Sequence, residues 1–555
     1  MKKFIVAILS ALILALMVAA FSACEWLNPK KEQNGPNAFQ YEAGPDYIKI
    51  TEIGGQQFAS QWDSPEYKLD DGEWQSEAEF TSLAPNTEYT VSVRFSENDR
   101  FKASDAYSEK ITTLKYEQDM PEVSLIQENK TIRFEENTAL EFSYDGGNTY
   151  TSGNEYTYTE NGKYTVKVRY KETEQKYSSA EQIFTVNISD FYSGSGAVDD
   201  PYLISTVDQF LKIDGGYYTL LNDLDFSGTV LSTPVRCKIF DGNGKKLKNV
   251  TLSATSADIA IFDYTCEKIN DLTVENAVVD FTGEQSERYK VYKVSLLAVG
   301  SWEVINCHLS GMINIRDDYY NQYYIGGIIA YGLVDISNCS VDIKITTNTN
   351  SWLYVGGIVG YGVSGNYKMY NSWANVDFSF TGVYAGYVGG IVGYMNGGSV
   401  ENCRADGEII VNGDNDYGAN SMYVGGIAGG LMNCKNCIST AAISANGLNQ
   451  NVKVGGIIGK AWGNRTIENC LSAGMLVVSM GSTTDCVCDS IAGEPEESTI
   501  FDSCYHMEDV ALGAATEHSI AVTAEIAKTL AWQKDVLGLD ESIWNLTDGE
   551  YPSLK

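Results

Sequence analysis

Val388-Gly-Gly-Ile-Val-Gly-Tyr394 is one copy of a heptapeptide that recurs through the second half of the chain. Other copies begin at Ile325, Val355, Val424 and Val454. The first glycines lie at 326, 356, 389, 425 and 455, so the spacings are 30, 33, 36 and 30 residues. A period in this range is typical of a solenoid, in which each unit buries its apolar face only against its neighbours.

A second motif, an asparagine followed by a cysteine or a serine, recurs with the same period. Its copies are Ile305-Asn306-Cys307, Ser337-Asn338-Cys339, Tyr370-Asn371-Ser372, Glu401-Asn402-Cys403, Lys435-Asn436-Cys437 and Glu468-Asn469-Cys470, with a looser copy at Asp502-Ser503-Cys504. Short runs of β-branched residues around both motifs indicate strands rather than helices. Strands that return once per unit predict a parallel β-helix of roughly nine coils between 240 and 505, about 40 Å long at the strand spacing.

Stacking of successive coils explains why these residue types recur. Asparagines at a turn can hydrogen-bond to their counterparts above and below. Cysteines of one column point in parallel, which is poor geometry for a disulfide, so they are expected to be small buried apolar residues. A zinc site would need four ligands in a definite arrangement, and the chain holds only three histidines, so no metal site is predicted.

The heptapeptide at 388–394 followed by Ser399-Val-Glu-Asn-Cys403 resembles the GLUG-type repeat of right-handed parallel β-helices in bacterial surface lipoproteins. Gly194–Ile204 resembles the usual opening of these solenoids, and Gly549–Leu554 their usual ending. The resemblance implies an N-terminal cap at 189–235, repeats at 236–508 and a C-terminal cap at 509–555. Short helices starting near Ser205 and Thr523 would cover the two ends. Such repeats occur in adhesins, lipoproteins and beside protease domains, so the fold does not fix the function.

Residues 1–24 are interpreted as a lipoprotein signal peptide. Lys2 and Lys3 precede an apolar run, and Phe21-Ser-Ala-Cys24 resembles a lipobox. The expected processing is lipid attachment at Cys24, which would anchor the protein to a membrane outside the cytoplasm, at the bacterial cell surface. Residues 25–37 are expected to form a flexible tether.

Two β-sandwich modules are predicted between the tether and the solenoid, at 38–115 and 116–188. The segment Leu83–Arg94 resembles a fibronectin type III strand, in which a tyrosine, here Tyr89, anchors a corner. The second, immunoglobulin-like module repeats the scheme around Tyr164. The predicted fold class is therefore all-β, with two small sandwiches followed by a parallel β-helix that carries short helical caps.

The formal net charge of −34 disfavours nucleic acid as a partner. No cofactor is expected. Calcium stays an alternative, because acidic loops such as the one holding Asp414 and Asp416 offer oxygen ligands, although no Asp-x-Asp-x-Asp-Gly loop is present.

Enzymes are the main alternative class, since right-handed β-helices often host polysaccharide lyases and glycosidases. Glycoside hydrolysis needs two carboxylates across the scissile bond. The solenoid arginines do not recur with acidic residues at a fixed offset, and no His-Glu-x-x-His motif occurs. No catalytic residue is therefore predicted.

Aromatic residues give the stronger functional signal. In most repeats a tyrosine lies two residues before the first glycine, and the loops leading to it carry further aromatics. These loops should stack on one side of the solenoid, where rings can bind a glycan or a protein. The candidate ligand-binding residues are Tyr319, Tyr320, Tyr323, Trp352, Tyr384 and Tyr417. Alternatively, the rings only stabilise the turns. The sequence thus predicts a non-enzymatic surface adhesin or ligand-binding β-helix, with a passive spacer as another alternative.

Overall fold

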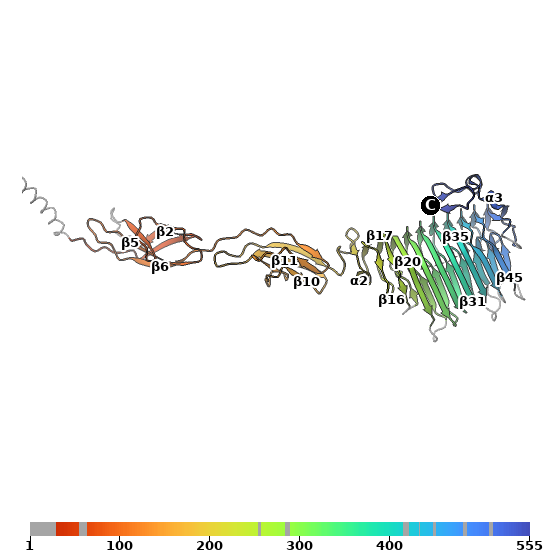
Figure 1. The fold of residues 1–555 in the computed structure, drawn as a ribbon, viewed down its shortest axis with the longest axis horizontal. Coiled ribbons are helices and arrows are strands. Elements are labelled where there is room, and N and C mark those ends of the chain that lie inside the picture. The colour runs from red at the N-terminus through yellow and green to blue at the C-terminus, as the bar shows by residue number, and fades with distance from the viewer. Residues whose placement is uncertain are drawn as a thin grey trace, which may run out of the picture. The chain divides into compact units, whose positions relative to one another are not determined.

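The computed structural model describes residues 29–54, 64–253, 257–283, 289–413, 421–431, 433–447, 451–480, 486–509 and 514–555. The chain divides into two compact units, residues 1–188 and residues 189–555 (Figure 1). It is nearly all-β, with about 3% helix, as predicted. Among the described residues, no helix has the length and hydrophobicity that a membrane crossing requires. Cys24 lies outside the described residues.

The first unit consists of small antiparallel sheets of three described strands each. The first module contains β1 (Ala38–Ala43), β2 (Tyr47–Gly54), β3 (Pro65–Leu69), β4 (Glu79–Thr81), β5 (Glu88–Phe95) and β6 (Tyr107–Thr112). The second contains β7 (Ile126–Glu128), β8 (Thr131–Arg133), β9 (Leu140–Ser143), β10 (Glu155–Thr157), β11 (Gly162–Tyr170) and β12 (Gln182–Ile188). The backbone N–H of Ala84 donates to the hydroxyl of Tyr89 over 2.9 Å, which confirms that this tyrosine anchors a corner.

The second unit is a parallel β-solenoid with three sheets, and its longest sheet has 24 described strands. This long sheet begins with β13 (Tyr202–Ile204), β14 (Tyr217–Leu220), β15 (Leu224–Asp225), β16 (Val230–Leu231), β17 (Ile239–Lys248), β18 (Thr251–Leu252), β20 (Lys268–Thr282), β22 (Glu303–Ile305), β23 (His308–Asp317), β26 (Asp335–Ser337), β27 (Ser340–Thr349) and β30 (Lys368–Tyr370). It continues with β31 (Trp373–Val383), β34 (Ser399–Glu401), β35 (Arg404–Gly413), β38 (Cys434–Lys435), β39 (Ile438–Ser439), β40 (Ala442–Gly447), β43 (Thr466–Glu468), β44 (Leu471–Ser472), β45 (Leu476–Met480), β48 (Ile500–Asp502), β49 (Tyr505–Met507) and β50 (Ile520–Val522).

The other two sheets of the solenoid meet at the Gly-Gly pair of each heptapeptide. The second sheet holds β19 (Asp258–Ile259), β21 (Val291–Ser295), β24 (Gln322–Gly326), β28 (Trp352–Gly356), β32 (Ala385–Gly389), β36 (Ser421–Gly425), β41 (Asn451–Gly455) and β46 (Val487–Asp489). The third holds β25 (Ile329–Gly332), β29 (Val359–Gly362), β33 (Val392–Met395), β37 (Ala428–Leu431), β42 (Ile458–Ala461) and β47 (Ala492–Pro495). Eight strands in the second sheet correspond to about eight turns, close to the predicted nine.

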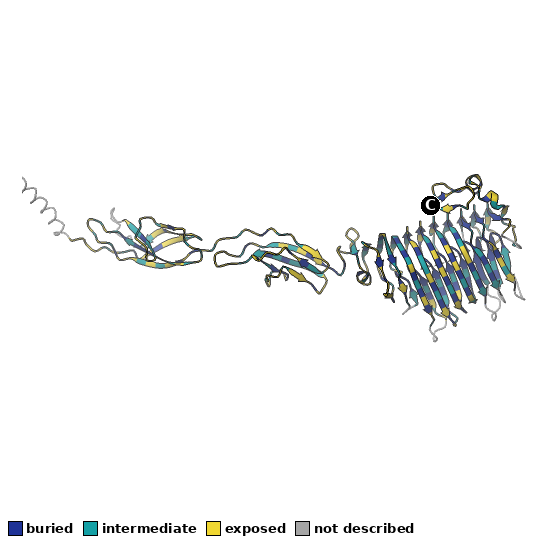
Figure 2. Ribbon diagram, viewed as in Figure 1, coloured by how far each residue is buried: buried dark blue, intermediate teal, exposed yellow. Residues whose placement is uncertain are grey.

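The register of the coils follows the repeats. Gly356 pairs with Gly326 before it and with Gly389 after it, and the same column continues through Gly425 to Gly455. Buried and exposed positions alternate along the strands (Figure 2), because successive side chains of a strand point to opposite faces. Inward side chains of all coils form one continuous apolar core.

The Asn-Cys turns also stack in register. All six asparagines of this motif have left-handed backbone conformations, with φ between 50° and 55°, and so does Ser503 in the looser copy. Asparagine tolerates this conformation better than most residues. The amide of Asn402 donates to the side chain of Asn371 over 3.3 Å, and Asn436 donates to Asn402 over 3.0 Å. The cysteines that follow are buried, as expected.

A short helix covers the N-terminal end of the solenoid. Helix α2 (Val207–Phe210) has Thr206 as its N-cap, and the Phe210 ring contacts the rings of Phe226, Phe240 and Phe262. This helix therefore covers the open end of the first coil, as predicted.

The C-terminal segment is placed differently from the expectation. It contains α3 (Ala524–Ala527), η1 (Trp532–Val536), β51 (Trp544–Asn545) and β52 (Ser553–Leu554). Trp532 and Trp544 pack in a separate cluster with Ile438, Leu471 and Tyr505, which occupy one outward column of three successive coils. The segment thus covers the side of the solenoid and not only its last coil, because this outward column is apolar.

Candidate binding site

Three of the predicted aromatic residues line one hollow on the solenoid, of about 490 Å³. Tyr320, Trp352 and Tyr384 come from successive coils, where they lie just before or at the first residue of β24, β28 and β32. The full set of described lining residues is Tyr289, Tyr320, Asn321, Gln322, Trp352 and Tyr384.

The rings of the hollow contact one another edge to face. The ring centroids of Tyr320 and Tyr384 lie 5.6 Å apart at 87°, and those of Trp352 and Tyr384 lie 5.8 Å apart at 64°. Such tilted contacts are the arrangement that aromatic pairs prefer. Trp352 remains 37% exposed and Tyr289 82% exposed, so both present apolar surface to solvent.

A buried polar network holds the loop that carries Tyr320. The carboxylate of Asp317 accepts hydrogen bonds from Asn321 Nδ2 over 2.7 Å and from the Tyr323 hydroxyl over 2.5 Å. Ser351 Oγ of the next coil accepts from the backbone N–H of Asn321 over 3.0 Å, and Asn321 Oδ1 accepts from Lys290 N of the preceding coil over 2.9 Å. Hydrogen bonds of Asn321 therefore join three successive coils at the hollow.

The remaining predicted residues lie elsewhere. Tyr323 is fully buried, stacks on Tyr292 with centroids 5.0 Å apart, and does not reach the surface, which corrects its assignment as a ligand-binding residue. Its position has the same parity as the inward Ile325, so strand alternation turns it into the core. Burial, followed by the hydrogen bond to Asp317, raises the pKa of Tyr323. Tyr319 is half-buried and does not line the hollow.

Two further predictions concern residues that the structure does not describe, and one residue of the hollow was not predicted. Tyr417 and the acidic loop at 414–416 lie outside the described residues. Tyr289 was not predicted, although the pairing of Val291 with Gln322 places it one coil before Tyr320 at the same position. Aligning Val294 with Ile325, as the structure pairs them, places Tyr289 at the position of Tyr320.

The residue types of the hollow suit binding more than catalysis. Aromatic faces offer apolar area, while amides and phenolic hydroxyls offer hydrogen-bond donors and acceptors. None of the described residues that line it is a carboxylate, a histidine or a cysteine. Across the described part of the chain, no three such side chains come together as a metal site.

Comparison with protein families places one match on this region. Residues 384–410 match the GLUG motif. The chain carries a GLUG repeat. The matched segment contains Tyr384 of the hollow and the heptapeptide at 388–394. A comparison with curated protein sequences finds no significant match.

Solved structures give distant matches. A segment of two fibronectin type III domains from chicken tenascin is 11% identical, with 28% of this chain and 99% of that chain covered and a TM-score of 0.20. The FN1–FN3 domains of chicken CNTN1 are 14% identical, with 28% and 67% covered and a TM-score of 0.13. An IgA1 protease is 12% identical, with 79% of this chain and 33% of that chain covered and a TM-score of 0.33.

Tyrosines in and just before the heptapeptides form a second aromatic feature, which we call the tyrosine ladder. It comprises Tyr324, Tyr331, Tyr354, Tyr361, Tyr387, Tyr394 and Tyr423. In three coils the tyrosine before the first glycine contacts the tyrosine that ends the heptapeptide, with ring centroids 5.1 Å apart for Tyr324 and Tyr331, 5.2 Å for Tyr354 and Tyr361, and 4.9 Å for Tyr387 and Tyr394.

The ladder has a lysine near each end. Lys293 Nζ lies 5.4 Å from the ring of Tyr331, and Lys460 Nζ lies 4.9 Å from the ring of Tyr423. Lys460 also forms an ion pair with Glu494 over 2.8 Å. Because the rings cover one another and the cations cover the last rings, the ladder stabilises the corner between two sheets.

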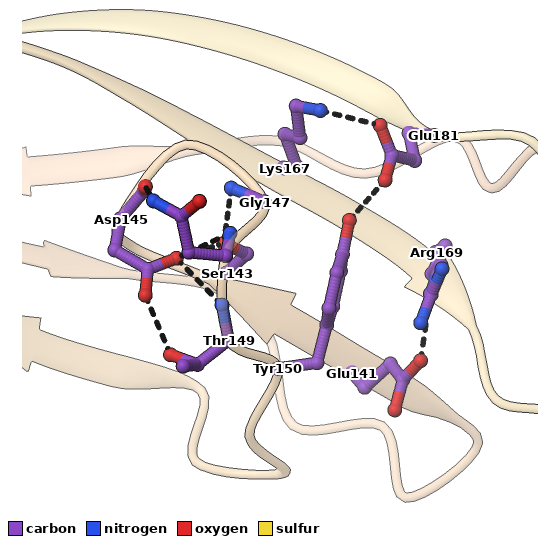
Figure 3. A network of polar contacts seen from close by, with 10 residues as sticks. Glu141, Ser143, Asp145, Gly147, Thr149, Tyr150, Lys167, Arg169 and Glu181 are labelled. Atoms are coloured by element: carbon purple, nitrogen blue, oxygen red, sulfur yellow. Dashed lines mark hydrogen bonds and ion pairs between the residues drawn. The ribbon is translucent and has the colours of Figure 1, made fainter.

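The second sandwich module contains a polar network of its own (Figure 3). Arg169 lies over the ring of Tyr150, with Cζ 3.8 Å from the centroid, and donates to Glu141 over 2.7 Å. Glu181 accepts from the Tyr150 hydroxyl and pairs with Lys167 over 2.8 Å. These groups form hydrogen bonds and ion pairs with one another across neighbouring segments of the module, so we infer that the network stabilises the sheet.

The loop beside this network is held in the same way. Asp145 accepts hydrogen bonds from Thr149 Oγ1 over 2.6 Å and from Ser143 Oγ over 2.7 Å. These and backbone hydrogen bonds lower the pKa of Asp145, with the Thr149 hydroxyl as the largest cause. The first module has a matching stack, in which Arg94 lies 4.1 Å from the ring of Trp74 and pairs with Glu66.

Proposed function

We propose that this protein is a non-enzymatic binding protein that recognises a glycan through the aromatic hollow of its solenoid. The observation that carries the proposal is the convergence of four aromatic side chains, from four successive coils, on one hollow that also contains Asn321 and Gln322. The apolar face of a sugar ring fits against Trp352, and its hydroxyl groups fit the amides and phenols. The repeat thus builds a site that no single coil contains.

We also propose that the protein is displayed on the bacterial cell surface as a lipoprotein. The lipobox-like sequence before Cys24 supports lipid attachment at that residue, and the segment 25–37 would tether the first sandwich module. The two modules would then act as spacers that present the solenoid to an extracellular glycan. In this arrangement the protein serves as an adhesin.

The hollow favours this proposal over the two alternatives. A glycosidase needs a carboxylate on each side of the bond that it cleaves, and the described lining residues include none. A passive spacer has no need to gather aromatic side chains from four successive coils around one hollow, as the solenoid does here.

The test is a glycan array probed with the full chain and with two matched variants. Trp352→Ala removes the exposed tryptophan of the hollow. Trp302→Ala removes a tryptophan that is 66% exposed but does not line the hollow. We expect Trp352→Ala to lose the signals of the wild-type chain and Trp302→Ala to keep them. A wild-type chain that binds no glycan, or a Trp352→Ala variant with an unchanged profile, would refute the proposal.

A further inference from the structure

The first coils of the solenoid bring two cysteine thiols together. Cys237 precedes β17, and Cys266 precedes β20 in the next coil. Their Sγ atoms lie 2.6 Å apart, and both side chains are almost completely buried. For comparison, the Sγ atoms of Cys434 and Cys470 lie 3.7 Å apart. The first pair is thus much closer to the disulfide bond length of about 2 Å than to an ordinary contact between two thiols.

The local backbone explains why these two thiols face each other. Val235 pairs with Phe262, but four residues later Ile239 pairs with Lys268, so the second coil has two additional residues in between. The additional residues form a turn in which Asp263 accepts a hydrogen bond from the N–H of Thr265 over 2.7 Å. The regular register resumes after this turn, so Cys266 lies two residues before Lys268, as Cys237 lies two residues before Ile239, the partner of Lys268, and the two thiols meet in the core.

We propose that Cys237 and Cys266 are the site of an intrachain disulfide bond that links the first two repeats of the solenoid. The oxidant is a small-molecule disulfide, such as oxidised glutathione, or a thiol–disulfide oxidoreductase in its disulfide form. One cysteine thiolate attacks the oxidant and forms a mixed disulfide, which releases one thiolate. The second cysteine thiolate then attacks the mixed disulfide at the cysteine sulfur and releases the other. Two protein thiols lose two protons and two electrons, and the oxidant gains both electrons as two thiols.

The environment of the pair indicates when the bond forms. The hydrogen bond to Cys266, and then burial, raise the pKa of the Cys237 thiol. Since the thiolate is the attacking species, the folded and reduced pair reacts slowly. The bond therefore forms while the chain folds, and once formed it lies shielded in the core.

Peptide mapping of the refolded full chain tests the proposal. The chain is refolded in a mixture of reduced and oxidised glutathione, and its thiols are then alkylated in denaturant and identified by mass spectrometry after trypsin digestion. We expect the peptide Cys237-Lys238 to be joined to the peptide 249–268, with a mass lower by two hydrogen atoms. Cys403, a buried thiol of the regular column, should be alkylated in the same sample and serves as the internal reference.

The outcomes are distinct and do not involve the glycan. Alkylation of Cys237 and Cys266 to the same extent as Cys403 would overturn the proposal, and so would linkage of either residue to a different cysteine. A Cys266→Ser variant should lose the joined peptide and leave Cys237 alkylated. The mapping of the wild-type chain decides the question even where that variant does not fold.

Discussion

Replacing Gly390 with alanine tests whether the glycine pair sets the distance between coils. A Cβ atom at Gly390 would lie 2.3 Å from the carbonyl oxygen of Gly426 in the next coil and 2.7 Å from Cβ of Ala405. Ordinary van der Waals contact begins at 3.4 Å, so the coils would have to separate locally by about 1 Å. Gly357, the equivalent glycine of the preceding coil, has the same 2.3 Å clearance.

The cost follows from two effects. Overpacking of a filled interior costs about 1–3 kcal/mol. The separation also stretches the hydrogen bond from the Gly390 N–H to the Gly426 carbonyl, which is 3.2 Å long in the wild-type chain. Loss of a hydrogen bond costs about 0.5–1.5 kcal/mol. We therefore expect Gly390→Ala to lower the free energy of unfolding of the solenoid by about 2–4 kcal/mol.

Urea unfolding of the full chain, followed by circular dichroism, measures this effect. Gly362→Ala is the matched control, because the nearest atom to its Cβ would be Cγ of the flexible Met395 side chain, at 3.2 Å, and the backbone of Met395 would lie in ordinary contact at 3.6 Å. Met395 occupies the equivalent position of the next coil. We expect the control to change the free energy of unfolding by less than about 1 kcal/mol. Equal transition midpoints for Gly390→Ala and the wild-type chain would refute close packing at the glycine pair.

Two further predictions concern the other columns. Burial raises the pKa of Tyr324, Tyr354 and Tyr387, that of Tyr354 to about 12, whereas an unfolded tyrosine ionises near pH 10. The ladder therefore contributes its full stabilisation below about pH 10, and this stabilisation is lost as the pH rises toward 12. In a pH titration, the tyrosinate absorbance of the ladder should appear only above the pH at which free tyrosine ionises, together with the loss of the circular dichroism signal. Full ionisation near pH 10 with intact structure would contradict the burial of the rings. In the Asn-Cys column, Asn402→Ala should lower the free energy of unfolding by about 1–2 kcal/mol, because alanine resists the left-handed conformation, and Asn402→Gly should lower it less. Equal losses for the two variants in urea unfolding would show that the amide, rather than the backbone, determines the stability.

Much of the solenoid could be predicted because its repeats fix the register. The Gly-Gly pair and the Asn-Cys motif each recur once per coil, and the structure stacks both as columns. The left-handed backbone of the asparagines did not follow from the period, although a residue such as Asn402 in every turn is a signal for it. The prediction for Tyr323 is wrong because its loop is not one continuous surface: Tyr323 has the same strand parity as Ile325 and therefore points into the core.

The hollow and the C-terminal segment were harder to predict. Tyr320, Trp352 and Tyr384 could be found as loop aromatics, but the edge-to-face packing that joins them depends on the side-chain orientations of three coils. The docking of Trp532 and Trp544 depends on outward residues that belong to strands of two or three residues. Strands this short have too few residues to show which face is apolar.

Calorimetric titration of the full chain with the glycan selected on the array tests the central claim most directly. Trp352 and Tyr384 contact each other in the hollow, so each alanine variant should weaken binding by about 30-fold, corresponding to about 2 kcal/mol for a central aromatic residue. Because both rings would contact the same ligand, the double variant should lose less than the sum of the two single losses. A wild-type dissociation constant in Trp352→Ala and Tyr384→Ala would contradict the account.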